Sequence, residues 1–259
     1  MKQRIITAVI ALLALLLVLF LVPEWAALAF IVVVMLGGAW EWSAFLGTSS
    51  RAGRLIYVAV IAALLAAVSL LAVDVTLVLQ AAMLWWVIAL IWTFFFPTAI
   101  PVAVRWLVGA LVLVPLYLAL ILLYSADPLI LLFALLIVWV ADSGAFFAGK
   151  TMGRVKLAPQ ISPGKTWEGV IGGLVAVVLL TLLRSTWVET DLTVFIPFCL
   201  AVACVSVVGD LTVSMFKRTA GLKDSGSLFP GHGGVLDRID SVAAAAPLFA
   251  LGLGWVGLQ

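Results

Sequence analysis

Residues 214–240 combine charged side chains with five glycines in a chain that carries few charges elsewhere. The segment contains Lys217, Arg218, Lys223, Asp224, His232, Asp237, Arg238 and Asp240. Asp237 and Asp240 lie one helical turn apart, so both can face one metal ion or one cavity. Mg²⁺ prefers carboxylate oxygens together with water and phosphate oxygens. The pattern therefore predicts a site for phosphates and a metal; a loop that only attracts anionic lipid needs charge but no glycines.

A stripe of polar residues leads into this segment. A helix through Asp210 places Ser214 and Lys217 on the same face, so the stripe leads from a carboxylate to a cation and suits a metal-bound phosphate. His232 lies between glycines and is equally consistent with a turn residue or a phosphate donor. A zinc site is not expected, because the chain has one histidine and its cysteines lie elsewhere.

Four acidic residues lie within or beside apolar runs, where an ionised side chain costs about 2.5–3.5 kcal/mol at the bilayer centre. Asp142 and Asp210 follow continuous apolar residues and have small neighbours, whereas Glu41 lies between two tryptophans and Glu168 opens an apolar run. Because all four fall toward the same side of the expected membrane, we predict a shared polar cavity. Glu41 is equally consistent with a boundary residue, and Glu168 with a favourable charge at a helix N-terminus.

Residues 162–168 resemble a phosphate-binding loop. That motif needs a glycine where Pro159 stands and a strand before it, and here an apolar helix is expected instead. A nucleotide-hydrolase fold is therefore excluded. Backbone amides of a glycine-containing turn at a helix start still attract phosphate, and Lys165 adds a positive charge; the alternative is a helix cap with a lysine on the cytoplasmic side.

The composition identifies the elements that position these residues. Of the 259 residues, 66% are hydrophobic and 10% are charged, against about 45–50% and about 25% in soluble domains. Continuous apolar runs of about 20 residues predict membrane-spanning helices and exclude a disordered chain or an outer-membrane β-barrel. The net charge of +2 suggests no nucleic-acid partner. Cys199 and Cys204 lie in an apolar run and imply no disulfide framework.

The expected fold is all-α, a polytopic membrane protein with about nine spans. The spans are about 5–22, 25–46, 55–73, 76–96, 104–125, 128–147, 168–187, 193–213 and 241–258. With the N-terminus in the cytoplasm, 13 of the 14 basic residues lie on the cytoplasmic side and only Arg184 lies near the other. The opposite loops hold Glu24, Asp74, Asp127, Glu189 and Asp191.

Two long polar connections, at about 148–167 and 214–240, are therefore predicted to be cytoplasmic loops that contain the chemistry. We divide the chain into N-terminal helices, residues 1–127, and a C-terminal catalytic region, residues 128–259. Gly169 and Gly173 form a small-xxx-small pair that predicts close helix packing.

Residues 214–240 resemble the signature of phosphatidate cytidylyltransferases, also called CDP-diacylglycerol synthases. That signature reads S-x-Φ-K-R-x4-K-D-x-G-x2-Φ-P-x-H-G-G-Φ-x-D-R-Φ-D, where Φ is apolar, and each specified position is met from Ser214 to Asp240. The lead-in at Asp210 and the stretch from Asp142 to Thr166 are also similar. The resemblance covers about the C-terminal half, because the earlier residues agree only in forming hydrophobic helices.

The resemblance implies an Mg²⁺-dependent integral membrane enzyme that joins CTP and phosphatidic acid, giving CDP-diacylglycerol and pyrophosphate for phospholipid biosynthesis. It implies the inner (cytoplasmic) membrane of a bacterium, with a polar cavity that faces the cytoplasm, and it leaves open a homodimer and a second cation. The expected metal ligands are Asp210 and Asp237, with Asp142 and Asp240 as second choices. The expected catalytic residues are Asp210, Asp237, Lys165, Lys217, Arg218, Lys223, Asp224, His232 and Arg238. The expected substrate-binding residues are Ser162, Lys165, Ser214, Lys217, Arg218 and His232.

Three other functions are compatible with part of the pattern. A transporter also places carboxylates within helices, but near the membrane midplane, whereas here the acids gather toward one face. A CDP-alcohol phosphotransferase needs the run D-G-x2-A-R-x8-G-x3-D-x3-D, which this sequence lacks. A lipid-binding scaffold would tolerate Asp→Asn changes.

Overall fold

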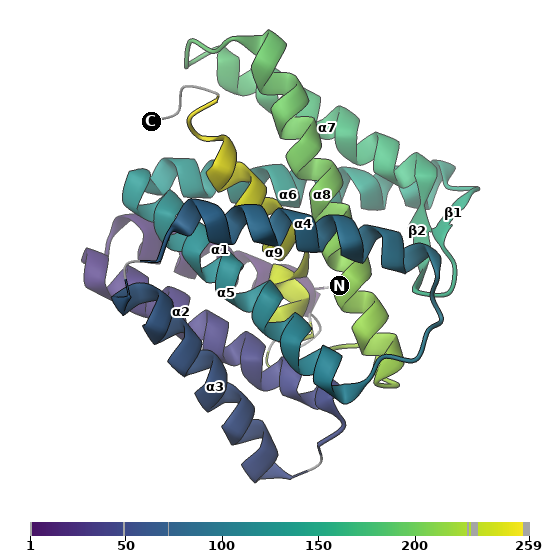
Figure 1. Ribbon diagram of the computed structural model, residues 1–259. Coiled ribbons are helices and arrows are strands. Elements are labelled where there is room, and N and C mark those ends of the chain that lie inside the picture. Colours follow the sequence, from purple (N-terminus) through teal and green to yellow (C-terminus); the bar gives the residue numbers. More distant parts are fainter. Residues whose placement is uncertain (1, 49, 72, 227, 229–232, 256–259) are drawn as a thin grey trace.

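The computed structural model describes residues 2–48, 50–71, 73–226, 228 and 233–255; within them the chain is almost entirely helical (Figure 1). The helices are α1 (Lys2–Phe20), α2 (Glu24–Trp42), α3 (Arg51–Leu70), α4 (Val75–Phe94), α5 (Val102–Ala126), α6 (Pro128–Met152), α7 (Trp167–Ser185), α8 (Leu192–Thr219) and α9 (Leu236–Gly252). A 3₁₀ helix, η1 (Ser43–Leu46), extends α2. Strands β1 (Lys156–Ala158) and β2 (Ser162–Thr166) form an antiparallel hairpin between α6 and α7.

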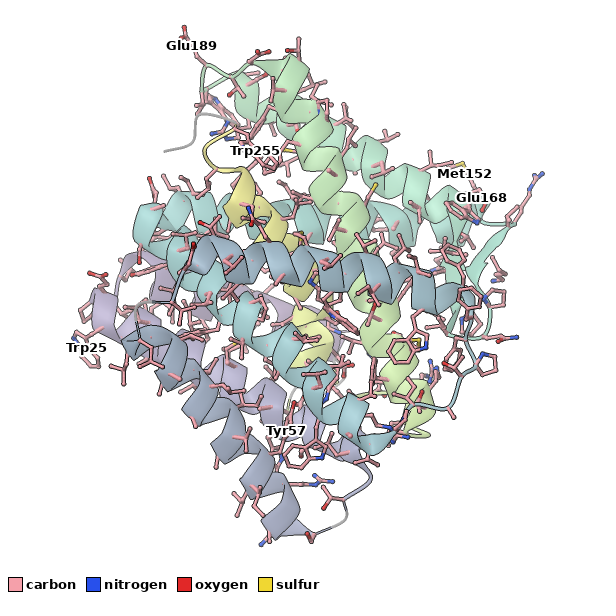
Figure 2. The ribbon with its side chains drawn as sticks, in the orientation of Figure 1. Trp25, Tyr57, Met152, Glu168, Glu189 and Trp255 are labelled. Carbon is pink, nitrogen blue, oxygen red and sulfur yellow. The ribbon has the colours of Figure 1, made fainter. Side chains whose placement is uncertain are left out.

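The predicted all-α membrane architecture is confirmed. Each predicted span coincides with one helix, in the same order. Among the described residues, seven helices are long and apolar enough to cross a membrane; the apolar part of α1 (Val9–Phe20) and the 17-residue α9 are shorter. The count of nine spans therefore stays a prediction. Large apolar side chains point outward from α3, α4 and α7 (Figure 2), as expected of a surface in contact with lipid.

Helix α9 lies inside the bundle, packed against α4, α5 and α8 (Figure 1). Its residues 243–246 are alanines with at most 2% of their surface exposed. Because these side chains are small, α8 approaches closely: a Cβ at Gly209 would lie 3.0 Å from the Cβ of Ala244 and would overlap the carbonyl oxygen of Asp240. This contact brings the polar ends of α8 and α9 together.

Helices α6 and α7 pack through glycines, which confirms the expected role of the small-xxx-small pair. A Cβ at Gly169 would lie 2.9 Å from the carbonyl oxygen of Ala145. A Cβ at Gly173 would lie 2.6 Å from that of Ala141. Larger side chains would force the two helices apart.

The two long polar connections are shorter than predicted. Helix α6 continues to Met152, and the rest of the 148–167 connection contains the hairpin, in which Lys156 pairs with Thr166. Helix α8 continues to Thr219 and α9 begins at Leu236, which leaves residues 220–235 as the α8–α9 loop. The physical reason is that backbone N–H and C=O groups need hydrogen-bond partners, and a helical turn or a hairpin supplies them where an open loop does not.

The predicted orientation in the membrane can be tested by cysteine labelling. In a background without the native cysteines, Ser50→Cys and Ala220→Cys should react with an impermeant maleimide only from the cytoplasmic side. Asp74→Cys and Glu189→Cys should react only from the other side, because basic residues are retained in the cytoplasm. Same-side labelling of positions 50 and 74 would exclude the predicted topology. Figure 2 shows Glu189 at one edge of the molecule and Glu168 near another, far from it.

Candidate active site

The hairpin places Lys165 directly before α7. Thr166 is the N-cap of α7, and its hydroxyl accepts a hydrogen bond of 3.1 Å from the amide of Gly169. The Glu168 carboxylate accepts from the Val155 amide, at 3.1 and 3.2 Å to its two oxygens, and so secures the start of the hairpin. Lys165 is therefore on a strand that is held at both sides, and not in the turn that the sequence predicts.

Arg218, near the end of α8, secures the hairpin from the other side. Its Nε donates to the carbonyl of Ile161 at 3.0 Å, and its Nη1 donates to the carbonyl of Leu222 at 3.2 Å. Because the guanidinium serves two backbone carbonyls, the contacts indicate that Arg218 positions the hairpin and the α8–α9 loop.

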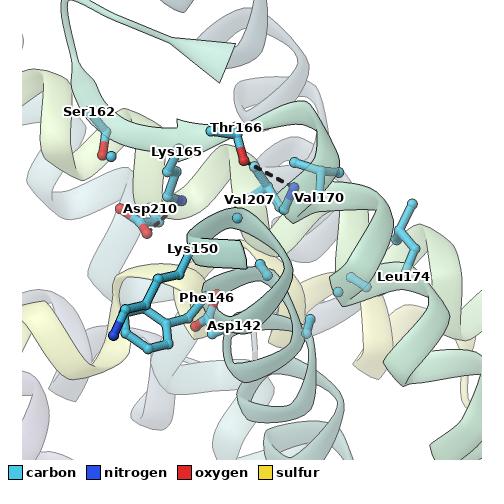
Figure 3. A pocket seen from close by; sticks show the side chains of 17 residues that line it. Asp142, Phe146, Lys150, Ser162, Lys165, Thr166, Val170, Leu174, Val207 and Asp210 are labelled. Atoms are coloured by element: carbon cyan, nitrogen blue, oxygen red, sulfur yellow. Dashed lines mark hydrogen bonds and ion pairs between the residues drawn. The ribbon is translucent and has the colours of Figure 1, made fainter. Parts of the chain in front are cut away.

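Lys165 and Asp210 form an ion pair at the mouth of a pocket. The Nζ of Lys165 lies 2.6 Å from Oδ2 of Asp210, and both side chains are 24% exposed. The other oxygen of Asp210 accepts a 3.0 Å hydrogen bond from Ser214. The pocket, of about 420 Å³, lies between α6, β2, α7 and α8, and Asp142 and Ser162 also line it (Figure 3). A cation, carboxylates and a hydroxyl therefore meet at one partly open site.

A second, more enclosed cluster surrounds Lys217. Its Nζ lies 2.8 Å from Oδ1 of Asp237 and 3.5 Å from Oδ2 of Asp240, and none of the three side chains is more than 10% exposed. Oδ2 of Asp237 accepts two further 2.9 Å hydrogen bonds, from the amides of Ser225 and Gly234. Asp237 therefore joins the α8 lysine to two separate points of the α8–α9 loop, Ser225 and Gly234.

The two clusters lie along one face of α8, as the predicted stripe requires. Asp210 belongs to the first cluster, Ser214 bonds to it, and Lys217 belongs to the second. Fixed cations and carboxylates at a partly enclosed pocket can bind polyphosphates and hold them for transfer, because charge is stabilised there without reorganisation of solvent.

The sequence model of the cytidylyltransferase family matches residues 2–255. The chain belongs to the cytidylyltransferase family. It is 44% identical over 269 residues to the phosphatidate cytidylyltransferase of Pseudomonas aeruginosa, covering 98% of each chain. It is 38% identical over 284 residues to that of Haemophilus influenzae, covering 96% of this chain and 97% of the relative. The resemblance inferred from residues 214–240 is thereby confirmed and extends to the N-terminal helices.

The structure of this cytidylyltransferase separates the predicted site residues into groups. One group of predicted site residues lines the pocket or belongs to one of the two clusters: Asp142, Ser162, Lys165, Asp210, Ser214, Lys217, Asp237 and Asp240. Lys223, Asp224 and Arg238 are exposed and belong to neither cluster. His232 lies outside the described residues. The roles of these residues in catalysis stay predictions.

The expectation of one cavity shared by four acids is wrong for two of them. Asp142 and Asp210 line the pocket. Glu168 turns to the Val155 amide instead, and Glu41 lies beneath the α8–α9 loop, where it binds Ser225 and two backbone amides. The sequence signal for Glu41, an acid between tryptophans at the end of a span, did not reveal these partners because they lie about 190 residues away.

The carboxylates fit a magnesium ion that is shared with substrate. Within the described ranges, no three Asp, Glu, His or Cys residues are grouped as a complete metal site. Mg²⁺ needs only one or two carboxylates when phosphates and waters complete its shell. Asp210 suits this role because its side chain is 24% exposed at the pocket, whereas the side chain of Asp237 is only 8% exposed.

Proposed function

We propose that this cytidylyltransferase transfers the cytidylyl group of CTP to phosphatidate, giving CDP-diacylglycerol and pyrophosphate for phospholipid biosynthesis. The observation that carries the proposal is the 44% identity, over 98% of both chains, to a phosphatidate cytidylyltransferase. The pocket with Lys165 and Asp210 supports it, since this reaction brings two polyanions together. The transporter alternative is not favoured, because the relatives are transferases.

The proposed reaction is an in-line displacement. A phosphate oxygen of phosphatidate attacks the α-phosphorus of CTP, the bond from that phosphorus to the bridging oxygen breaks, and pyrophosphate leaves with the bonding electrons. A phosphomonoester has a second pKa of about 6, so the nucleophile is already largely ionised at pH 7. The chief obstacle is repulsion between the substrates. Lys165 reduces it by placing positive charge in the pocket, and Lys217 adds positive charge further along α8.

We also propose Mg²⁺ as the cofactor. Asp210 and Asp237 are the first choices as its protein ligands, and Asp142 and Asp240 are the second; a second cation would use the remaining carboxylates. When bound, the ion supplies charge neutralisation and alignment of the phosphates. Ser162 lines the pocket and is placed to donate a hydrogen bond to a substrate oxygen. Ser214 instead donates its hydroxyl to Oδ1 of Asp210 and so orients that carboxylate.

The pocket also suits a substrate that is half lipid. Lys165, Asp210 and Ser162 form its polar end, and Figure 3 shows Leu174 at the far side from Asp210. We therefore place the phosphate of phosphatidate at the polar end, with its acyl chains directed toward the bilayer. In the bacterial inner membrane this end faces the cytoplasm, as the distribution of basic residues predicts. The homodimer that the resemblance leaves open is testable by cross-linking in membranes.

The activity is tested with purified protein in detergent micelles. Incubation with CTP, phosphatidate and Mg²⁺ should release pyrophosphate and form CDP-diacylglycerol in equal amounts, and omission of phosphatidate should abolish both. Pyrophosphate release that does not depend on phosphatidate would contradict the proposal, and so would vectorial uptake of a solute by proteoliposomes without turnover of CTP.

A comparison of two lysines in the same hairpin tests the role of Lys165. Lys165→Ala should lower kcat/KM for CTP by about 100-fold, because it removes a cation at the pocket mouth whose charge-assisted hydrogen bonds are each worth about 1.5–3 kcal/mol. Lys156→Ala is the matched control: Lys156 lies on β1, is exposed and does not line the pocket. Equal and negligible effects would leave Lys165 only as a determinant of topology.

A further inference from the structure

We infer that Glu41, at the end of α2, is a positioning residue that holds the α8–α9 loop in its active form. The carboxylate accepts three hydrogen bonds from this loop and the start of α9. The amide of Val235 donates to Oε1 at 2.9 Å, and the amide of Leu236 donates to Oε2 at 2.8 Å. The hydroxyl of Ser225 also donates to Oε2, at 2.8 Å. The inference rests on the proposed function, whose reaction the loop serves.

The surroundings of Glu41 suit a carboxylate at this position. The residue is only 7% exposed, and none of the ion pairs among the described residues includes it. Its partners are instead the amides at the start of α9, a helix whose N-cap residue, Val235, makes no side-chain cap. A carboxylate is favourable at this end of a helix, because the unpaired N–H groups there carry partial positive charge. Glu41 thus caps α9 from a helix that is distant in sequence.

Two glycines of the loop fit closely around the same carboxylate. A Cβ built at Gly226 or at Gly234 would overlap atoms of Glu41, and for each glycine all three of the nearest atoms belong to that side chain. Neither position has a left-handed backbone that would itself require glycine. The absence of side chains at these positions is therefore explained by the approach of the Glu41 carboxylate.

The same loop segments hold the site. Ser225 and Gly234 donate their amides to Oδ2 of Asp237 at 2.9 Å each, and Asp237 binds Lys217. Glu41 and Asp237 therefore both bind the loop at Ser225 and again where it enters α9. Loss of Glu41 should misplace Asp237 and Lys217, which costs turnover more than substrate binding because small errors of alignment act on the reacting geometry.

Variants of Glu41 test this role by kinetics. Glu41→Ala should lower kcat by about 100-fold and Glu41→Gln by about 10-fold, with KM for CTP changed less than about threefold, because each lost hydrogen bond to a charged group is worth about 1.5–3 kcal/mol. The Gln substitution should be milder than Ala because its amide oxygen still accepts a hydrogen bond. Its NH₂ group, however, replaces an acceptor and faces a donor of the loop. Ser43→Ala is the matched control: Ser43 is fully buried two residues away, and its hydroxyl donates to the carbonyl of Trp40 in the last turn of α2. Wild-type kcat in both Glu41 variants would refute the inference.

Limited trypsin digestion tests the anchoring without using activity, so it stays informative if the proposed reaction is wrong. Glu41→Ala should speed cleavage after Lys223, which is exposed in the loop, by about tenfold. Cleavage after Lys156, exposed in the hairpin, should keep its rate. Unchanged cleavage at Lys223 would overturn the anchoring role, and so would equal acceleration at both sites in Glu41→Gln, which is expected to fold.

A double-mutant cycle with Gly226 gives an independent result. Gly226→Ala should itself lower kcat and speed cleavage at Lys223, because its Cβ overlaps Glu41. In the Glu41→Ala background the same change should add less than about a twofold effect, since the clash is gone. Full additivity of the two substitutions would show that they act separately and would overturn the inference.

Discussion

Replacement of Asp210 by Asn is expected to abolish CDP-diacylglycerol formation and to leave the protein inserted and folded. The change keeps size but removes the charge that pairs with Lys165 and that is proposed to bind Mg²⁺. Metal and anionic substrates then lose alignment, and we expect a loss of turnover of at least about 1,000-fold, the scale of losing one major electrostatic contribution to a transition state. Because the pair is partly exposed, its loss should alter the melting temperature little.

Turnover across a Mg²⁺ series, beside a melting curve, measures this effect. Excess Mg²⁺ should restore part of the activity if the site is only weakened. Asp127→Asn is the matched control, since Asp127 caps α6 through the Leu129 amide and lines no part of the pocket. Asp237→Asn should be as damaging as Asp210→Asn, because it also disturbs the loop amides that Asp237 binds. Near-normal turnover of both variants at low Mg²⁺ would move Asp142 and Asp240 to first choice as metal ligands.

Replacement of Lys217 by Met is expected to cost both activity and stability. Lys217 is the cation between Asp237 and Asp240, and its side chain is only 9% exposed. Without Lys217, the enclosed carboxylates of Asp237 and Asp240 lose their shared cation. Breaking a buried ion pair in this way lowers the free energy of unfolding by about 3–5 kcal/mol. The melting temperature should therefore fall clearly, and turnover should be lost with it.

A second substitution separates the two losses. Lys217→Met combined with Asp240→Asn should recover much of the stability, because one unpaired charge is gone, and should stay inactive because the cation is still missing. Lys223→Met, an exposed position in the adjacent loop, should match wild type in melting temperature. A Lys217→Met protein that melts like wild type would contradict the view that this ion cluster holds α8 to α9.

The helical part of the fold was predictable because each membrane span is specified by its own residues. A run of about 20 apolar residues satisfies its backbone hydrogen bonds internally, so the helices of the described residues follow the predicted order. The predicted ends of the helices were less accurate than their order. The pairing of β1 with β2 was missed because its hydrogen bonds join residues across a turn, and the polar segment 156–166 shows no strong alternation of apolar and polar residues.

The candidate site shows the same division. By itself the sequence determined the family, through residues 214–240, and the stripe of Asp210, Ser214 and Lys217, because residues four and seven apart on one helix share a face. Tertiary structure alone decided that Lys165 meets Asp210, that Arg218 serves backbone carbonyls, and that Glu41 closes on the α8–α9 loop. These contacts join residues that are at least 45 positions apart in the chain, from elements that only the packing of the helices brings together. Spacing along a sequence carries no record of such distances.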